Sequence, residues 1–514
     1  MNINKYLMLG GVALGLGLTS CVGDLDLEPI DPNLESPESS TILINEAMQC
    51  YQTMATSGQE GPGSSIISGL DNGRGQYTRA IFMMNEFPTD ECIWIWKDDG
   101  IYDLVTNTFD ATNGNIYGTY SRLYAHIAVC NQFLADAAGS NDAEIVRLRD
   151  EVRALRAMSY YWVCDIFGKA SKSMSAPDGT EPEQMTREEL YTWLEAELKD
   201  LVDNGNLADV PVYGRVGKDG AQALLARLYL NAEVYTGHAM YAECAEACKH
   251  VLEGGMQLAN EYKYLFCGSN DRYVGQGEIL WAAPQQVGSM ESWGGTTYLT
   301  AGAYSDKMPA DVLKQLGADF TPWSGLKVRP ELINAFEPGD KRFLFYTDGL
   351  TNSVENLDDY EYEGYVCTKY RYVSEDNYDN DPAAGPTVYS TGGMCDADYP
   401  VFRLADTYLM LAECEARGVA GLDGIGYYNK VRERAGLPKA ESMSLDDILH
   451  ERQVELYWEG HRRSDLIRFG KFTGSSYLWS WKGGVYDGAS IPEYRSLFAI
   501  PYSYVSVIGQ NTGY

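Results

Sequence analysis

Apolar residues recur with the period of an α-helix from about residue 45 to residue 255. Within 142–168, behind a capping box Asn141…Glu144, the apolar stripe holds Ile145, Leu148, Val152, Leu155, Trp162 and Ile166. Within 186–204, behind a second box Thr186…Glu189, it holds Leu190, Trp193, Leu194, Leu198 and Leu201. These patterns predict a mostly α-helical protein.

Three of the expected helices share a small residue followed three positions later by an aromatic one: Ala157…Tyr160, Ala226…Tyr229 and Ala405…Tyr408. Such steps allow two helices to approach closely, as in tetratricopeptide-like repeats. We expect Ala221–Tyr235 to pair with Tyr241–Glu253, and 398–418 to pair with 421–435. The predicted fold is a scaffold of helix pairs on both sides of a different middle region.

The middle region, about 256–397, interrupts the helical period. It is rich in Gly, Tyr, Trp and Asp and contains strand-like runs at Glu278–Ala282 and Tyr365–Val373. Irregular segments on a rigid scaffold often carry binding residues, so we place the ligand site here. A later helix is expected to start near Ser444 and to carry the charged run 451–468. We interpret the charges of that run as a structural ion-pair network.

Charge and cysteine content exclude several classes of protein. With 40 basic and 73 acidic residues among 514, the formal charge is −33, which disfavours binding to nucleic acid. The 11 cysteines are scattered without CxxC spacing, so neither a zinc ribbon nor a dense disulfide scaffold is indicated. Cys244 and Cys248, four residues apart on an expected helix, are interpreted as core residues.

The N-terminus predicts export and lipid attachment. Residues 1–20 have one positive charge, Lys5, and then an uncharged stretch too short to span a bilayer. Leu18-Thr19-Ser20-Cys21 resembles a bacterial lipobox, in which Cys21 becomes the acylated first residue. Residues 21–41 are acidic and rich in proline, so we expect a flexible tether. The alternative is an ordinary secretory signal with a chance cysteine.

Taken with these features, the ending ERQVELYWEGHRRSDLIRFGKF resembles the SusD/RagB family of glycan-binding lipoproteins of Bacteroidetes. The resemblance covers nearly the whole chain and implies a single body over 42–514. NEFPTDECIWIW (85–96), GGTTYL (294–299) and LWSWKGG (478–484) are similar to the starch-binding branch of that family. An acidic stretch after the lipidated cysteine also resembles the signal for export to the cell surface.

The resemblance implies an arc of aromatic side chains, Trp96, Tyr298 and Trp323, that cups an α-1,4-glucan. Arg79 falls at the family's hydroxyl-bonding arginine, and the alternative for it is a structural ion pair. Asp99 aligns where the family has an amide, and a carboxylate accepts hydrogen bonds but does not donate them. Trp94 and Trp96 are expected to face opposite sides, with Trp94 in the core. Trp293 is a weaker candidate.

By the same resemblance, the protein is a non-catalytic lid on a SusC-like TonB-dependent transporter and delivers malto-oligosaccharide to it from the cell surface. GxSxG, HExxH, P-loop and GxGxxG motifs are absent, and the five histidines do not cluster in sequence. The alternatives are a surface-anchored glycoside hydrolase, a binder of a different glycan, and a pure scaffold for the transporter. We expect no cofactor, although Asp376–Asp381 has the composition of a calcium loop.

Overall fold

The computed structural model describes residues 39–70, 73–174, 183–356, 362–378 and 392–514. The first helix of the described ranges, α2, begins at Ser39, inside the range expected for the tether. The predicted signal peptide, Cys21 and the rest of the tether lie outside the described residues. None of the helices in the described ranges is long and apolar enough to cross a membrane.

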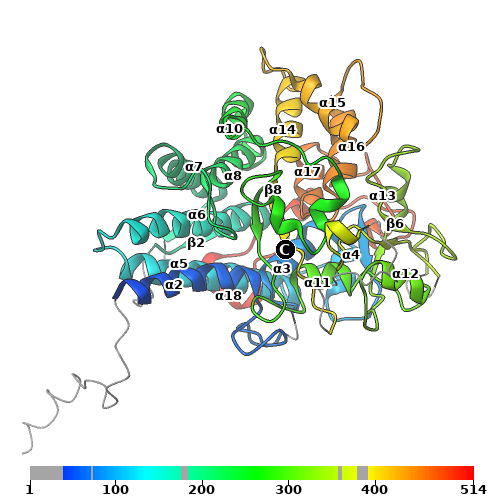
Figure 1. Ribbon diagram of the computed structural model, residues 1–514, viewed down its shortest axis with the longest axis horizontal. Coiled ribbons are helices and arrows are strands. Elements are labelled where there is room, and N and C mark those ends of the chain that lie inside the picture. Colours follow the sequence, from blue (N-terminus) through cyan, green and yellow to red (C-terminus); the bar gives the residue numbers. More distant parts are fainter. Residues whose placement is uncertain (1–38, 71–72, 175–182, 357–361, 379–391) are drawn as a thin grey trace, which may run out of the picture.

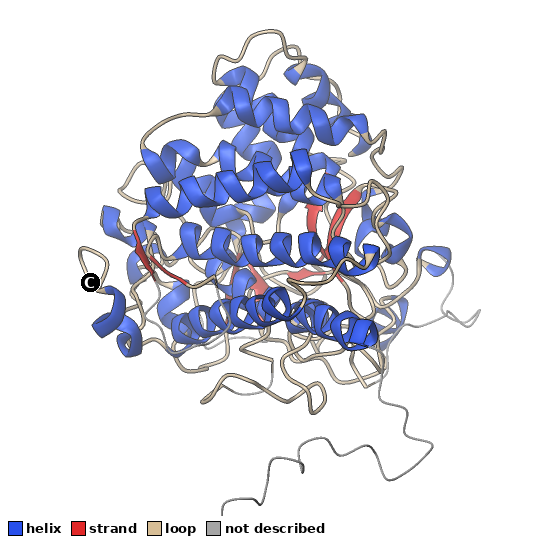
Figure 2. Ribbon diagram, turned by 90° about the vertical axis from the view of Figure 1, so that its left-hand side faces the viewer, coloured by secondary structure: helices blue, strands red, loops and turns tan. Residues whose placement is uncertain are grey.

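The N-terminal helices form the larger layered part of the molecule. They are α2 (Ser39–Ala55), α3 (Tyr77–Glu86), α4 (Ile101–Val105), α5 (Gly114–Asp136), α6 (Ala143–Ile166), α7 (Arg187–Asn204), α8 (Lys218–Leu230), α9 (Ala232–Thr236) and α10 (Tyr241–Glu253). α2, α5, α6, α7, α8 and α10 pack successively on one another, and Figures 1 and 2 show them side by side. The predicted helical scaffold is confirmed.

Capping decides where the two best-predicted helices begin. At α7 the predicted box is present, since the Thr186 side chain accepts from the Glu189 N–H and the Glu189 carboxylate accepts from the Thr186 N–H. At α6 the prediction was wrong by one residue. The cap is Asp142, whose carboxylate accepts from the backbone N–H groups of Glu144 and Ile145 at 2.9 and 3.2 Å. Asn and Asp both cap well, and Asp142 has the extended backbone that a cap needs.

The predicted helix pair 221–254 is present with one break. α8 and α10 pack along each other, but the first helix ends at Leu230 and a short helix, α9, follows Asn231. The Asn231 side chain donates to the Arg227 carbonyl at 3.0 Å, as a residue that ends a helix often does. Cys244 and Cys248 are buried on α10, as predicted.

Within the described residues, strands form four two-stranded antiparallel pairs. They are β1 (Cys92–Trp94) with β5 (Leu326–Val328), β2 (Ala170–Lys172) with β3 (Glu183–Met185), β4 (Ile279–Ala283) with β8 (Tyr399–Arg403), and β6 (Phe345–Tyr346) with β7 (Val366–Cys367). β4 confirms the first predicted strand run. In the second run only Val366–Cys367 is a strand, and residues 399–403, predicted as helix, form β8.

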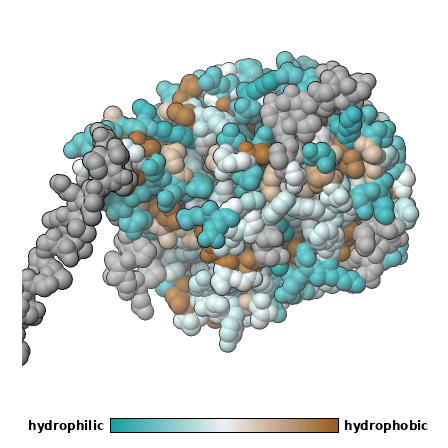
Figure 3. Space-filling view, turned by 60° about the horizontal axis from the view of Figure 1, so that its bottom comes forward, coloured by the Kyte–Doolittle hydropathy of each residue, from teal (hydrophilic) through white to brown (hydrophobic). Residues whose placement is uncertain are grey.

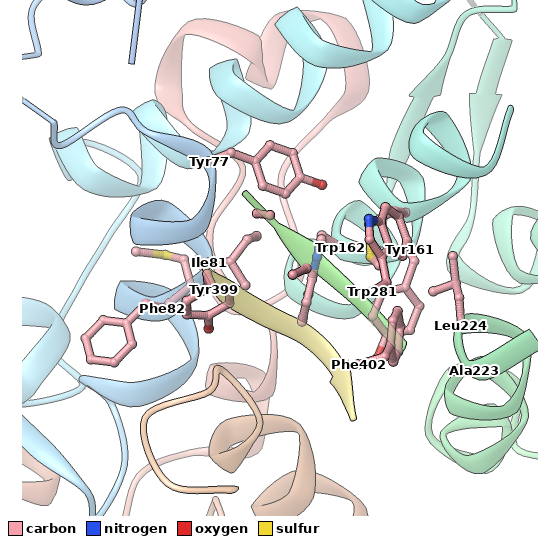
Figure 4. Packing of buried hydrophobic residues seen from close by; sticks show 14 of the residues in the cluster. Tyr77, Ile81, Phe82, Tyr161, Trp162, Ala223, Leu224, Trp281, Tyr399 and Phe402 are labelled. Atoms are coloured by element: carbon pink, nitrogen blue, oxygen red, sulfur yellow. The ribbon is translucent and has the colours of Figure 1, made fainter. Parts of the chain in front are cut away.

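β4 and β8 lie in the centre of the core (Figure 4). Trp281 on β4 stacks on Phe402 on β8, with 6.1 Å between ring centroids. Figure 4 shows these rings beside Trp162 and Tyr161 of α6 and near Leu224 of α8. The strand pair therefore joins the helical layers to the middle region through one continuous core.

The middle region has only short regular elements among loops. Its helices are α11 (Gly295–Thr300), α12 (Ala310–Gln315) and α13 (Pro330–Asn334). Its described 3-10 turns are Tyr262–Phe266, Asn270–Tyr273 and Glu375–Asn377, and two further ones, Lys482–Gly484 and Glu493–Ser496, lie near the C-terminus. The irregular character predicted for 256–397 is confirmed in its described residues.

The C-terminal helices complete the scaffold beside this region. They are α14 (Leu404–Ala416), α15 (Gly424–Arg434), α16 (Leu445–Leu456), α17 (Arg462–Arg468) and α18 (Tyr502–Ile508). The run 451–468, predicted as one helix, is two helices, because Trp458 and Gly460 between them have φ of 62° and 78°. α16 starts after Ser444, as predicted.

The charges of this run do form a buried structural network, but mostly with distant partners. Arg468 pairs with Asp465 at 2.7 Å within α17. Arg462 pairs with Asp90 at 2.7 Å, before β1. Longer connections complete the network: Arg463 with Asp165, Glu455 with Arg342, Arg403 and Arg434, and Glu459 with Arg403 and Lys369. Arg452 of α16 also pairs with Asp465 of α17 at 2.8 Å, so the network fixes the two helices to each other and to distant segments of the chain.

Candidate functional site

The β1–β5 ladder sets the position of the first predicted aromatic residues. Trp94 lies opposite Leu326, and the ladder continues one step further because the Ile95 N–H donates to the Gly325 carbonyl at 2.9 Å. Gly325 is required here because a Cβ atom would lie 2.5 Å from the Trp94 ring. The ladder thus places Trp96, one residue after Ile95, beside the segment that carries Trp323.

Trp94 is buried, with 5% of its surface exposed, whereas Trp96 is 43% exposed. The expectation that the two rings face opposite sides was wrong. Side chains two residues apart in a strand lie on the same face, and the rings meet edge to face with 5.2 Å between centroids. The Trp94 Nε1–H donates to the Asp98 carboxylate at 2.8 Å. Trp94 therefore lies in the core, as predicted, and supports Trp96.

Tyr298, on α11, has no exposed surface. Its ring stacks on Trp94 with 5.0 Å between centroids and 29° between planes. The prediction that Tyr298 faces a ligand was wrong for this reason, since Trp94 covers the face that a sugar would need. Burial raises the pKa of the Tyr298 hydroxyl above its ordinary value, and the nearby Arg79 charge opposes that rise.

Arg79, on α3, lies behind the same ring. Its guanidinium carbon is 3.9 Å from the centroid of the Tyr298 ring, and only 6% of the residue is exposed. This is cation–π geometry. The structure gives Arg79 a supporting position instead of the ligand-facing one that the resemblance implied. Trp96, Trp94, Tyr298 and Arg79 form a stack from the surface into the core, which we call the tryptophan stack.

Asp99 lies in an exposed turn beside Trp96, and its backbone is held by the helical scaffold. Its carbonyl accepts from Arg74 Nη2 at 2.8 Å and from Asn115 Nδ2 at 3.2 Å. The Gly100 carbonyl accepts from Asn113 Nδ2 at 2.7 Å. Asn113 caps α5, so the start of that long helix fixes the turn. Asp99 therefore lies beside Trp96, and its predicted role in glycan binding stays a prediction.

A hollow of about 580 Å³ brings Trp96 and Asp99 together. Sequence reasoning did not name five of the residues that line it: Tyr102, Asp103, Glu355, Asn356 and Trp481. Tyr102 is 50% exposed on α4. Trp481 is anchored by its Nε1–H, which donates to the Val354 carbonyl at 2.6 Å. The signal for Trp481 was present, since it lies within the motif LWSWKGG.

Trp323 does not line this hollow. It is half-buried, and its ring contacts Trp293, the weaker candidate, with 5.7 Å between centroids. The backbone N–H of Trp323 donates to the carbonyl of Ala301, the residue directly after α11, at 2.8 Å. The described residues therefore hold two partly exposed aromatic groups on adjacent segments, one at Trp96 and one at Trp293 and Trp323.

No cluster of three or more His, Cys, Asp or Glu side chains suited to a metal ion occurs in the described ranges. Of the candidate calcium loop, Asp376 is described, and its carboxylate pairs with Arg272 Nη2 at 2.8 Å. Residues 379–381 of that loop lie outside the described residues. His126 and His461 are buried in the core. Burial lowers the pKa of His126 to about 4 and that of His461 to about 3.

Comparison with known proteins identifies the family. The chain is 32% identical to the starch-binding protein SusD of Bacteroides thetaiotaomicron over 98% of this chain and 97% of that protein. This chain belongs to the SusD family. The family model itself, described as the SusD family, matches residues 339–498. A SusD-like protein of Bacteroides ovatus is 25% identical over 73% of this chain and 69% of its own length.

Solved structures show the SusD fold. A SusD superfamily protein from Parabacteroides distasonis superposes with a TM-score of 0.71 at 20% identity, covering 93% of this chain and all of that one. Surface glycan-binding protein A from Bacteroides thetaiotaomicron, solved with laminarihexaose, also gives a TM-score of 0.71, at 19% identity. It covers 92% of this chain and 99% of its own. The mostly α, tetratricopeptide-like fold class and the family prediction are confirmed.

Proposed function

We propose that the protein binds starch or malto-oligosaccharide, α-1,4-glucans, without cleaving them, and that Trp96 is the central stacking residue. The observation that carries this proposal is the tryptophan stack. It presents one exposed indole on a rigid, buried support, beside a hollow with both aromatic and polar walls. The similarity to a protein named for starch binding supports the choice of glycan.

Rigid aromatic rings suit sugar recognition for a physical reason. The C–H face of a pyranose packs on an indole, and a ring already fixed in position loses little conformational entropy when the ligand binds. Trp96 is fixed by its edge contact with Trp94, which is itself held by Tyr298 and Asp98. The polar rim beside Trp96 includes Asp99, whose carboxylate accepts hydrogen bonds from sugar hydroxyl groups.

We propose that Trp323 extends the same surface, with Trp293 behind it. Ile95 bonds to Gly325 across the ladder, so Trp96 and Trp323 each lie within two residues of one backbone hydrogen bond. A curved α-glucan touching both indoles would cross the end of that ladder. Tyr298 takes no direct part, and its role is to hold Trp94.

We further propose that acylated Cys21 anchors the protein to the outer membrane at the cell surface. There it would deliver glycan to a SusC-like TonB-dependent transporter. The lipobox-like Leu18–Cys21 and the acidic tether support the anchor, and family membership supports the transporter. The formal charge of −33 requires a partner whose facing surface tolerates it.

The test separates glycan binding from the alternatives. Affinity electrophoresis in amylopectin and in laminarin measures which glycan retards the purified protein, and a reducing-end assay on the same samples measures cleavage. We expect retardation in amylopectin and no release of reducing ends. Retardation only in laminarin would show that the protein binds a different glycan from the one proposed. Release of reducing ends would favour a hydrolase. Absence of retardation in both glycans would favour a scaffold.

A further inference from the structure

A second hollow, of about 600 Å³, lies on the helical layers, among α7, α8 and α10. In Figure 1 these helices lie on the other side of the molecule from α4, which borders the glycan hollow. No residue lines both hollows. We call this second one the acidic hollow, because its lining holds six carboxylates, Asp203, Asp209, Asp219, Glu243, Glu246 and Glu253, and two lysines.

The carboxylates of Asp203, Asp209, Asp219 and Glu243 make no hydrogen bond or ion pair with described residues. Burial and the neighbouring Asp209 carboxylate raise the pKa of Asp219 to about 6, and Lys218 only partly offsets this rise. Gly254, at the end of α10, makes the close approach possible, since a Cβ atom there would lie 2.5 Å from Asp219 Oδ2. The hollow therefore holds four carboxylates that form no ion pair with the described residues.

Gln222 provides an independent observation. Its side chain lines the acidic hollow and is 94% buried, being only 6% exposed, yet it makes no hydrogen bond with any described residue. The amide atoms are not sealed from the hollow, so they are available to a polar group bound there. Because the amide lies at the hollow, a polar ligand there would satisfy it.

The acidic groups gather at two ends of the hollow. Asp219, Gln222, Leu225 and Tyr229 follow one face of α8, and ten residues of helix place its ends about 15 Å apart. Asp219 and Asp209 mark one end. At the other end the carboxylates of Glu243 and Asp203 are close enough to Tyr229 to help raise its hydroxyl pKa. Leu225 and Val202 provide apolar surface between them.

We propose that the acidic hollow binds a linear polyamine, with ammonium groups at both acidic ends, its methylene chain on Leu225, and one nitrogen bonded to Gln222. A divalent metal fits less well, because these acids are not grouped closely enough to hold one ion. Separated charges joined by a flexible apolar chain match separated carboxylates on an apolar floor.

Titration calorimetry of spermine into the full protein at low ionic strength tests this proposal, with butylamine and Mg²⁺ as comparison ligands. Binding should be saturable, with one spermine per chain, and much weaker for butylamine. We expect Asp219→Asn and Glu243→Gln each to weaken spermine binding about tenfold, the loss typical of one hydrogen bond to a charged group. Gln222→Leu should weaken it without changing the charge.

Glu188→Gln is the matched control, because Glu188 is an exposed acid on α7 about 22 Å along the helix from Asp203. It should leave spermine binding within twofold of wild type, and thermal melting of each variant without ligand reports whether it folds. Three results would overturn the proposal: no saturable heat with spermine, a loss in Glu188→Gln as large as in Asp219→Asn, or Mg²⁺ binding lost in the same variants.

Discussion

The ring of Tyr298 is sandwiched between Trp94, with 5.0 Å between ring centroids, and the guanidinium of Arg79, 3.9 Å from the ring centroid. Tyr298, a residue expected at the surface, is thus the third layer of the tryptophan stack, below Trp96 and Trp94. Exposed aromatic groups elsewhere are scattered, and on the face in Figure 3 the hydrophobic residues are interspersed with hydrophilic ones. Trp96 is connected to the core by the three side chains stacked behind it.

The Tyr298 hydroxyl is buried and has no hydrogen-bond partner among the described residues, so we expect Tyr298→Phe to keep both stability and glycan affinity. Tyr298→Ala should lower the free energy of unfolding by about 3–5 kcal/mol, the range for truncating a large buried aromatic, and should weaken glycan binding by loosening Trp94. Urea unfolding and calorimetry measure the two effects. A large loss of glycan affinity in Tyr298→Phe would show that the hydroxyl contacts the ligand, contrary to this account.

The Lys97–Gly100 turn depends on one glycine. Gly100 has a φ of 73°, and a Cβ atom there would lie 2.8 Å from Asn113 Nδ2. Gly100→Ala should therefore destabilise the protein by more than the cost of the left-handed backbone, about 1–2 kcal/mol, and should weaken glycan binding. Gly237→Ala is the control, with a φ of 78° and no atom within 4 Å of the new Cβ. Equal losses of stability in the two variants would argue against the contact with Asn113.

The Arg462–Asp90 pair joins the family's C-terminal motif to the segment before β1. Arg462 Nη2 lies 2.7 Å from Asp90 Oδ2, and both side chains are almost fully buried. Arg462→Met leaves a buried carboxylate unpaired, so it should lower the free energy of unfolding by about 3–5 kcal/mol. The exposed pair Lys249–Glu246, at 3.3 Å, is the control, and Lys249→Met should cost about 1 kcal/mol or less. Similar losses in chemical denaturation would contradict the structural role of the buried pair.

Asp398 should make stability depend on pH. Burial raises its pKa to about 7, although the Gln285 N–H and the Tyr213 hydroxyl, both donating to it, oppose the rise. Because the folded pKa exceeds the unfolded one, its contribution to stability is present below about pH 3.8 and is lost as the pH rises through 7. Asp398→Asn removes this loss, so its stability relative to wild type should improve between pH 5 and pH 8. The free energy of unfolding in urea is measured for both proteins across that range. A difference between them that does not change with pH would refute the assignment.

Local signals were sufficient for the helices that begin with their own caps. Thr186 and Glu189 are three residues apart, so the sequence contains both halves of the interaction that starts α7. The break after α8 was not predictable, because Asn231 interrupts no apolar stripe and its side-chain oxygen bonds to Arg468, far along the chain. β8 was missed for the same reason, since its partner β4 is more than a hundred residues away.

The site was predictable only in part. Trp96 and Asp99 are three residues apart in sequence, and family resemblance assigned both to the glycan site; in the structure both line one hollow. The burial of Tyr298 depends on Trp94 and Arg79, which come from other elements, so no local pattern reveals it. Trp481 reaches the hollow through its bond to Val354, another contact between distant segments.

Calorimetric titration of maltoheptaose into the purified protein tests the central claim most directly, with Trp96→Ala, Trp323→Ala and Tyr502→Ala measured alongside. Tyr502 is 76% exposed on α18 and serves as the control aromatic. We predict saturable binding by wild type and by Tyr502→Ala, and a loss of about tenfold or more in each tryptophan variant, within the range for truncating a central stacking residue. Absence of binding by the wild type, or unchanged affinity in Trp96→Ala, would contradict the account.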